Sequence, residues 1–179
     1  MTPPTDQSPE RPDAVPASGG ALRHALRDLP SPVVVVTTET ASGPRGATIG
    51  SFTSVSLDPP LISFNVTHKS RLHEALGEGR GWAVHLLSAG QAAVAERFAR
   101  PDMDGDDQLA PFDHVRGDGP PLLRGPLAIL LCEPHAQFEA GDHTVFVGRV
   151  DGIVEGAGRD PLLYYRQSYR GVGDPVQSV

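Results

Sequence analysis

Residues 46–60 read Gly46-Ala-Thr-Ile-Gly-Ser-Phe-Thr-Ser-Val-Ser-Leu-Asp-Pro-Pro60. The part from Gly46 to Leu57 is rich in β-branched and hydroxyl side chains, which predicts one long strand ended by a Pro-Pro turn. A second strand is expected over Leu61–Thr67. The chain then reaches Lys69-Ser-Arg71, where Ser70 is a suitable cap for a short helix. This stretch therefore predicts two strands that lead to paired cations at a helix start.

Strand signals also occur on both sides of this stretch. They come with short turns and only two or three small helices, so the chain is predicted to be all-β (β-dominated α+β), with an antiparallel barrel in a single domain. The other expected strands are Val33–Thr38, Trp82–Leu87, Leu127–Phe138, Thr144–Val154 and Leu162–Tyr165.

The expected helices are short and lie between the strands. Leu22, Leu26 and Leu29 have helical spacing before Pro30, and a second helix is expected from Ser70 to Leu76, closed by Gly77 and Gly79. A capping box at residues 88–91 begins a third helix, which ends before Pro101.

Three other parts of the chain are expected to lack regular structure. Residues 1–18 contain five prolines and are predicted to form a disordered arm. The acidic residues 101–121 are expected to form a loop. The domain is expected over residues 19–172, followed by a tail over 173–179.

Composition excludes several classes of protein. The 179 residues are 39% hydrophobic and 21% charged, which is a globular composition, and the net charge of −7 argues against a nucleic-acid surface. The single cysteine, Cys132, allows no intrachain disulfide and is expected to pack as a small apolar residue. No apolar run approaches the ~18 residues of a membrane helix, and the N-terminus is not a signal peptide, so a cytoplasmic protein is expected.

Several common catalytic and binding motifs are missing from the sequence. It contains no Gly-x-Gly-x-x-Gly fingerprint, no Walker phosphate loop and no Gly-x-Ser-x-Gly elbow. The acidic run 102–107 differs from a calcium loop in its glycine position and lacks the closing glutamate. The histidines show no His-x-x-x-His pair in a helical setting, so no metal site is expected.

Lys69 is the only lysine among 15 basic residues. Together with Ser70 and Arg71 at a helix start, it would suit a phosphate dianion. The alternative is a solvated loop without a ligand.

Hydroxyl groups lie on both faces of the strand predicted over 46–57. Thr48 shares one face with Ser54, and Ser51 shares the other with Thr53. They are either ordinary strand-surface residues or the polar edge of a ligand site. Similarly, His143 follows the Gly141-Asp142 turn, and it is either a turn neighbour or a residue at a pocket rim.

Six segments, in order, resemble the flavin reductase-like family, from about Leu22 to Arg170. They are Val35-Val-Thr-Thr38, Ser51-Phe-Thr-Ser-Val-Ser-Leu-Asp-Pro-Pro-Leu61, Ser70-Arg71, Arg97-Phe-Ala99, Gly141-Asp-His-Thr144 with Phe146-Val-Gly-Arg-Val150, and Pro161-Leu-Leu-Tyr-Tyr165. The chain departs from the family pattern at Ser31-Pro32 and Gly50.

The resemblance implies an antiparallel Greek-key split barrel that binds FMN, with FAD as the alternative. It also implies hydride transfer from NADH or NADPH, with His143 positioning the nicotinamide. The expected flavin-binding residues are Thr48, Ser51, Phe52, Thr53, Ser54, Asn65, Lys69, Ser70, Arg71, Phe98, Ala99 and His143.

The resemblance further implies a homodimer that supplies reduced flavin to a partner monooxygenase. Two alternatives stay open at this point. One is a flavin-binding split barrel with oxidase or carrier function and no reductase activity, and the other is an interaction module without flavin.

Overall fold

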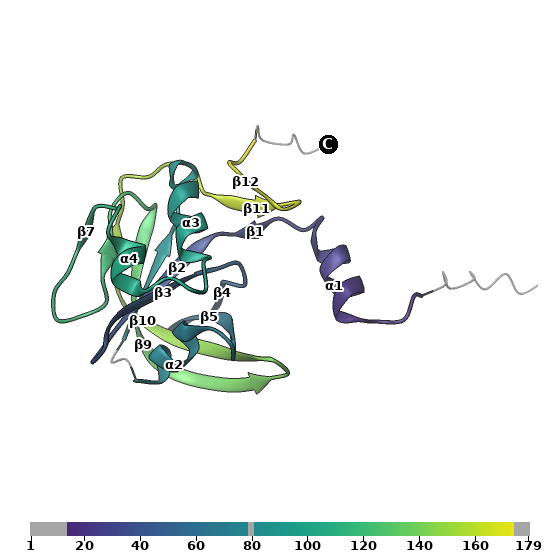
Figure 1. Ribbon diagram of the computed structural model, residues 1–179, viewed down its shortest axis with the longest axis horizontal. Helices are drawn as coiled ribbons and strands as arrows, with labels where there is room; N and C mark the ends of the chain where they lie inside the picture. Colours follow the sequence, from purple (N-terminus) through teal and green to yellow (C-terminus); the bar gives the residue numbers. More distant parts are fainter. Residues whose placement is uncertain (1–13, 79–80, 174–179) are drawn as a thin grey trace, which may run out of the picture.

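A computed structural model describes residues 14–78 and 81–173 (Figure 1). Residues 1–13 of the predicted arm lie outside the described residues. Gly79 and residues 174–179 of the predicted tail also lie outside them. The described helices include one 3₁₀ turn, η1. They are α1 (Gly19–Leu26), α2 (Arg71–Glu78), η1 (Ala89–Gln91), α3 (Ala92–Phe98) and α4 (Gly105–Leu109).

Seven antiparallel strands form the main sheet, in the order β3-β2-β6-β9-β10-β5-β4. The hairpins β2–β3 and β4–β5 lie at opposite edges, and the chain then returns to place β6 beside β2. This non-sequential order is a Greek-key connection, which confirms the predicted fold class. The main-sheet strands are β2 (Val34–Thr40), β3 (Gly43–Ile49), β4 (Thr53–Leu57), β5 (Pro60–Thr67), β6 (Trp82–Leu86), β9 (Ala128–Ala140) and β10 (His143–Glu155).

Two smaller sheets accompany the main one. One has the order β1-β11-β12, and the other pairs β7 with β8. Their strands are β1 (Ser31–Pro32), β7 (His114–Val115), β8 (Leu122–Leu123), β11 (Leu163–Tyr165) and β12 (Ser168–Arg170).

The prediction of a single strand over Gly46–Leu57 is wrong. Residues 50–52 have no strand pairing, and they separate β3 from β4, which lie at the two edges of the sheet. Ser51 joins the two regions because its hydroxyl accepts a hydrogen bond from the backbone N–H of Asn65 on β5 (2.9 Å). The curled sheet therefore uses one continuous β-rich segment for both of its edges.

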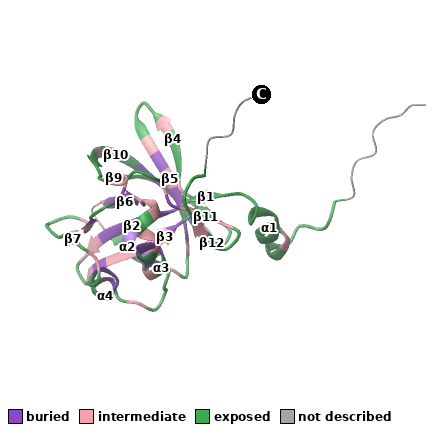
Figure 2. Cartoon of the chain, turned by 90° about the horizontal axis from the view of Figure 1, so that it is seen from above, coloured by how far each residue is buried: buried purple, intermediate pink, exposed green. Residues whose placement is uncertain are grey.

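The unbroken valine run near the start of β2 packs on both faces of the sheet. Val34 and Val36 join a core that also contains Phe64 and Trp82. Val33 and Val35 join a second core, which includes Phe98 from α3 and Leu109 from α4. Because successive strand residues point to opposite faces, this run requires apolar packing on both sides. Figure 2 shows buried residues in the strands of the main sheet.

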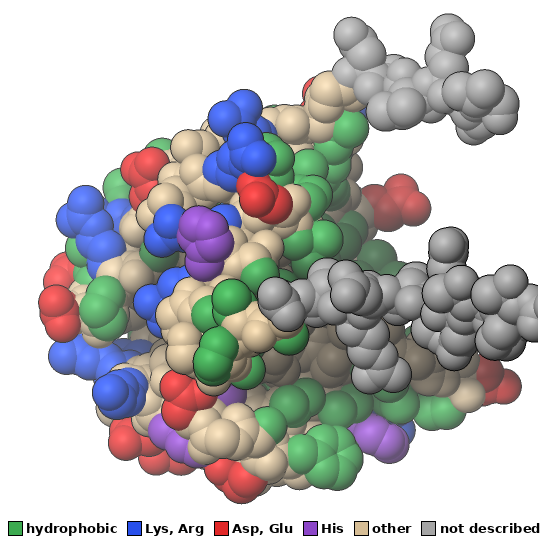
Figure 3. All heavy atoms as spheres, turned by 90° about the vertical axis from the view of Figure 1, so that its right-hand side faces the viewer, with side chains coloured by type: hydrophobic (Ala, Val, Ile, Leu, Met, Phe, Trp, Pro, Cys, Tyr) green, Lys and Arg blue, Asp and Glu red, His purple; other side chains and the backbone are tan. Residues whose placement is uncertain are grey.

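Helix α1 differs from the other α-helices because none of its residues is buried. Ser18 caps it by accepting a hydrogen bond from the N–H of Ala21 (3.1 Å). The side chains of Leu22, Leu26 and Leu29 are each more than half exposed. Figure 1 shows the helix projecting away from the barrel, and Figure 3 shows hydrophobic side chains on the face from which it projects.

The region expected to be an acidic loop contains α4 and strand β7. Asp104 caps α4, because its carboxylate accepts a hydrogen bond from the N–H of Asp106 (3.2 Å). A Cβ on Gly105 would lie 1.9 Å from the carbonyl oxygen of Pro44, so α4 packs tightly on β3. The loop prediction was wrong here because a five-residue helix has too few apolar positions to show periodicity.

Two titratable groups in the barrel are structural. The Nδ1 of His85 lies 2.9 Å from the carbonyl oxygen of Val35, and its Nε2 accepts a hydrogen bond from the N–H of Leu123 (3.1 Å). Burial lowers the pKa of His85 from 6.5 to about 4, so the ring is neutral near pH 7. Cys132 is buried in the first core, which confirms that it packs as a small apolar residue, and burial raises the pKa of its thiol to about 12.

Among the described residues, no helix combines the length and apolar character needed to cross a bilayer.

Candidate functional site

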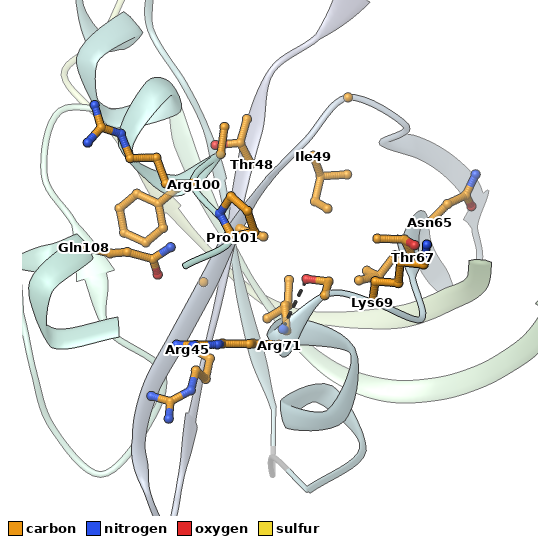
Figure 4. Close-up of a pocket in the computed structure, with 18 of the residues that line it drawn as sticks. Arg45, Thr48, Ile49, Asn65, Thr67, Lys69, Arg71, Arg100, Pro101 and Gln108 are labelled. Atoms are coloured by element: carbon orange, nitrogen blue, oxygen red, sulfur yellow. Dashed lines mark hydrogen bonds between the residues drawn. The ribbon is translucent and has the colours of Figure 1, made fainter. Parts of the chain in front are cut away.

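A cavity of about 450 Å³ opens between β3, the β5–α2 turn and the segment after α3 (Figure 4). This volume is in the usual range for sites that bind small molecules or cofactors. All but three of the residues expected at the site line this cavity. These lining residues are Thr48, Ser51, Asn65, Lys69, Ser70, Arg71, Phe98, Ala99 and His143.

The β5–α2 turn forms one wall of the cavity. Ser70 organises it, because its backbone N–H donates to the carbonyl of Thr67 (2.9 Å) and its hydroxyl accepts from the N–H of Leu72 (3.2 Å). This arrangement leaves Lys69 and Arg71 exposed at the cavity. Within the described part of the chain, neither cation belongs to a salt bridge. Their charges are therefore available to a ligand.

The opposite wall comes from β3 and from the end of α3. The Phe98 side chain is buried in the second core and also lines the cavity. It can lie there because Gly46 has no side chain: a Cβ at Gly46 would be 2.6 Å from the Phe98 ring. Arg100 and Gln108 line the same side (Figure 4).

The charge of the cavity differs from that of the whole chain. Arg45, Lys69, Arg71 and Arg100 line it, whereas none of its described lining residues is Asp or Glu. Arg45 is partly neutralised, because its Nη1 lies 3.7 Å from an oxygen of Asp104. In a chain with a net charge of −7, four cations around one cavity favour an anionic ligand.

Several expected site residues have other roles in the structure. The Thr48 hydroxyl lines the cavity but donates to the carbonyl of Ala95 in α3 (2.7 Å). Thr53 and Ser54 lie on β4, outside the cavity, and Phe52 packs against the barrel core. The reason is the break at residues 50–52, which removes β4 from the face that Thr48 occupies.

His143 begins β10 and lies opposite Thr67 of β5, so the β9–β10 hairpin brings it to the cavity rim. Its Nδ1 lies 2.7 Å from a carboxylate oxygen of Asp142, and this hydrogen bond lowers the pKa of the Asp142 carboxyl. The aspartate therefore orients the imidazole at the rim.

The sequence pattern did not identify several lining residues. Arg45, Gly46 and Arg100 have no recognisable motif, and the region of Gln108 was expected to be a loop. The Arg100-Pro101 pair after α3 indicates the end of a helix, but it does not indicate a ligand site. Only the packing of α3 and α4 on β3 brings these residues to the cavity.

The chemistry of the lining is binding chemistry. Among the described residues of the cavity, the hydroxyls of Thr48, Ser51, Thr67 and Ser70 have backbone partners, and none is paired with an imidazole as nucleophilic catalysis requires. An elongated ligand fits this cavity if its negatively charged end lies near the cations and its apolar part lies near Phe98. Such a site suits a group that supplies its own reactivity while the protein positions it.

Comparisons with known proteins agree with this geometry. The family described as "Flavin reductase like domain" matches residues 26–173. An FMN reductase (NADH) of Agrobacterium fabrum is 39% identical over 145 residues, covering 80% of each chain. The reductase component of 4-hydroxyphenylacetate 3-monooxygenase from Thermus thermophilus is 34% identical over 150 residues, covering 84% of this chain and 94% of its own.

A solved structure is also similar. It is an NADH:FAD oxidoreductase of Streptomyces globisporus in complex with NAD and FAD fragments. It has a TM-score of 0.79 and 37% identity, and the match covers 87% of this chain and 93% of that one.

Proposed function

Because this chain belongs to the flavin reductase-like domain family, we propose that it is an NAD(P)H:flavin oxidoreductase that reduces FMN or FAD. The observation that carries this function is the cavity itself, where four cations and no carboxylate of the described chain surround a space of about 450 Å³. The alternative of a barrel without reductase activity has no specific support in the cavity, and the named relatives are reductases.

The phosphate of the flavin binds at the β5–α2 turn. Lys69 and Arg71 supply positive charge, and Ser70 holds the turn through its two hydrogen bonds. Cations that donate hydrogen bonds to a phosphate form charge-assisted contacts, which are stronger than neutral ones. The absence of salt bridges to these two cations in the described chain leaves both free for this role.

The residues that would hold the flavin ring line the cavity between the two walls. Ser51 and Asn65 provide polar groups at one side, while Phe98 and Ala99 border the other. Thr53 and Ser54 take no part, because β4 lies outside the cavity. The Thr48 hydroxyl holds α3 against β3 and thereby supports the wall.

The nicotinamide binds near His143, which Asp142 orients at the rim. The cofactors supply the redox chemistry, in which hydride passes from the nicotinamide to the flavin ring. The residues of the protein hold the two rings in position and restrict water in the cavity. NADH is the proposed donor, since the FMN reductase and FAD oxidoreductase relatives are both named with NADH.

A partner monooxygenase receives the reduced flavin. The support is the Thermus thermophilus relative, which is the reductase component of such an enzyme.

A steady-state assay tests the reductase function. FMN, FAD and riboflavin are each combined with NADH and with NADPH, and oxidation of the nicotinamide is followed by its absorbance. We expect flavin-dependent oxidation of NADH, with NADPH the poorer donor. No flavin dependence with either nicotinamide would remove the proposed function.

The protein also forms a homodimer, in which α1 of one copy packs on the other. Leu22 and Leu26 lie about one helical turn apart on α1, Leu29 follows the helix, and all three are more than half exposed, so they offer an apolar surface to a partner. Replacing all three by serine should convert the dimer to a monomer in light scattering. The matched control is R23A in the same helix, which should remain dimeric. A monomeric wild-type protein would contradict the proposal.

A further inference from the structure

Two imidazoles and a carboxylate converge between the β5–α2 region and the β9–β10 hairpin. His68 lies in the β5–α2 turn, His73 on α2, and Glu139 near the end of β9. One ligand atom from each lies within 4.8 Å of the other two. None of the three residues lines the cavity, so this cluster is separate from the proposed flavin site. Figure 1 shows α2 beside the β9–β10 hairpin, where the cluster forms.

Hydrogen bonds already hold the three side chains near one another. The Nε2 of His68 lies 2.9 Å from a carboxylate oxygen of Glu139. The buried Thr144 hydroxyl donates to the other oxygen of Glu139 (2.9 Å) and lies 2.7 Å from Nε2 of His73. Because the hydroxyl has one proton, it accepts from His73. The metal-free cluster is therefore a chain of hydrogen bonds from His68 through Glu139 and Thr144 to His73, which keeps the two imidazoles and the carboxylate close together.

Two histidines and a glutamate form a ligand set that zinc uses in proteins, with an open fourth position for water. Two ligands of a tetrahedral zinc lie about 3.3 Å apart, given bonds of about 2.0–2.1 Å. The observed separations are close enough for small side-chain rotations to reach this geometry. The exposed fractions of the His68 and Glu139 side chains, 39% and 70%, leave both free to rotate. When His73 binds zinc through Nε2, this atom loses the proton that it otherwise donates to the Thr144 hydroxyl.

We propose that His68, His73 and Glu139 form a Zn²⁺ site, with water as the remaining ligand. His68 and His73 lie on either side of the segment that carries Lys69 and Arg71. The backbone N–H of His68 already donates to the carbonyl of Asp142 (3.1 Å). Bound zinc thus ties both ends of the β5–α2 turn to the β9–β10 hairpin. The proposed zinc site consists of residues outside the cavity and requires no flavin.

A direct metal titration tests the site without any activity measurement. Full-length protein is treated with a chelator, freed of flavin and titrated with Zn²⁺ by calorimetry, and Co²⁺ is used to obtain the visible spectrum of a tetrahedral site. We expect one Zn²⁺ per chain and a melting temperature that rises with the Zn²⁺ concentration, because the metal binds only the folded state.

Conservative variants locate the ligands. H68Q, H73Q and E139Q should each weaken Zn²⁺ binding at least about tenfold, because an amide cannot replace an imidazole or carboxylate ligand. Gln at position 73 can still donate to Thr144. The matched control is H135Q, which changes an exposed histidine on β9 outside the cluster and should bind zinc as the wild type does.

The metal-free melting temperature of each variant serves as the folding control. If H73Q does not fold, H68Q and E139Q decide the question, since both side chains are exposed. Absence of binding by folded wild-type protein would overturn the proposal, and so would unchanged binding in folded H68Q and E139Q. A failed flavin reductase assay would leave this result unaffected, because the titration contains no flavin.

Discussion

The barrel interior and the rim of the cavity use the same types of residue in opposite ways. In the interior, His85 is fully buried, neutral and bonded to two backbone groups. At the rim, His143 is partly exposed and bonded to a charged aspartate. Arginine and lysine likewise gather around the cavity, whereas the two apolar cores contain no cation among their described members.

This difference separates stability from binding. The buried polar side chains of Thr37, Thr38 and His85 have protein partners. Loss of one of these side chains leaves a buried partner unsatisfied and destabilises the fold. At the rim, Lys69 and Arg71 are exposed and have no carboxylate partner in the described chain, so their loss costs the fold little. Substitutions in the barrel interior should therefore change the stability of the fold, whereas substitutions at the cavity rim should change ligand binding.

The largest expected effect concerns His85 and pH. Its folded-state pKa of about 4 lies below the ordinary 6.5, so the unfolded chain binds the proton more readily. The contribution to stability is complete above pH 6.5 and is lost as the pH falls toward 4, by about 3 kcal/mol. Urea unfolding at several pH values should show a shallower loss in H85Q, whose amide can bond to both backbone partners but does not titrate. Parallel pH curves for the two proteins would contradict this assignment.

The next effect concerns the rim cations. The double variant K69A/R71A should weaken FMN binding by about 2–3 kcal/mol, roughly 30- to 150-fold, because two charge-assisted phosphate contacts are lost. Fluorescence titration should show little change for riboflavin, which lacks the phosphate, and the urea midpoint should stay constant.

The matched control for this prediction is R23A, which removes an exposed cation on α1 outside the cavity. It should keep FMN affinity within about twofold. An equal loss for FMN and riboflavin in K69A/R71A would place the phosphate elsewhere.

Gly46 connects the two regions, because Phe98 belongs to the second core and to the cavity wall. In G46A the new Cβ would lie 2.6 Å from the Phe98 ring, so the ring must move. We expect a loss of about 1–2 kcal/mol in the free energy of unfolding, as for other overpacked sites, together with weaker flavin binding. G77A is the control, since a Cβ there meets no atom within 4 Å. Unchanged stability in G46A would show that Phe98 is free to relax.

The smallest effect concerns His143. H143Q should raise the KM for NADH about three- to tenfold, at constant FMN affinity and constant urea midpoint, because one polar contact at the rim is altered. H135Q, on the exposed part of β9, serves as the control. A change in FMN affinity as large as that in KM would assign His143 to the flavin.

Much of the site was predictable from local signals. A cap residue between two cations indicated the start of α2, and Gly141-Asp142 indicated the hairpin that carries His143. The valine run before Thr37 likewise predicted a buried strand, because consecutive β-branched residues favour strands. Each of these signals depends on residues that are close in sequence.

Other features had no local signal. The residues on both sides of Gly50 continue the same β-rich pattern, so the pattern did not show that β3 and β4 separate. Arg45 and Arg100 become neighbours of one cavity only because α3 packs on β3 through Phe98 and Gly46. The approach of His73 to Glu139 depends similarly on α2 lying beside the β9–β10 hairpin.

The sequence by itself determined the β-rich class, the positions of the main-sheet strands other than β3 and β4, and the cation pair beside a capped helix. These depend on backbone preferences and short-range hydrogen bonds, which a few adjacent residues decide. Only the tertiary structure decided which distant residues form the cavity and the histidine cluster. Strand order and helix packing result from burying apolar surface across the whole domain. No single segment determines that collective free energy.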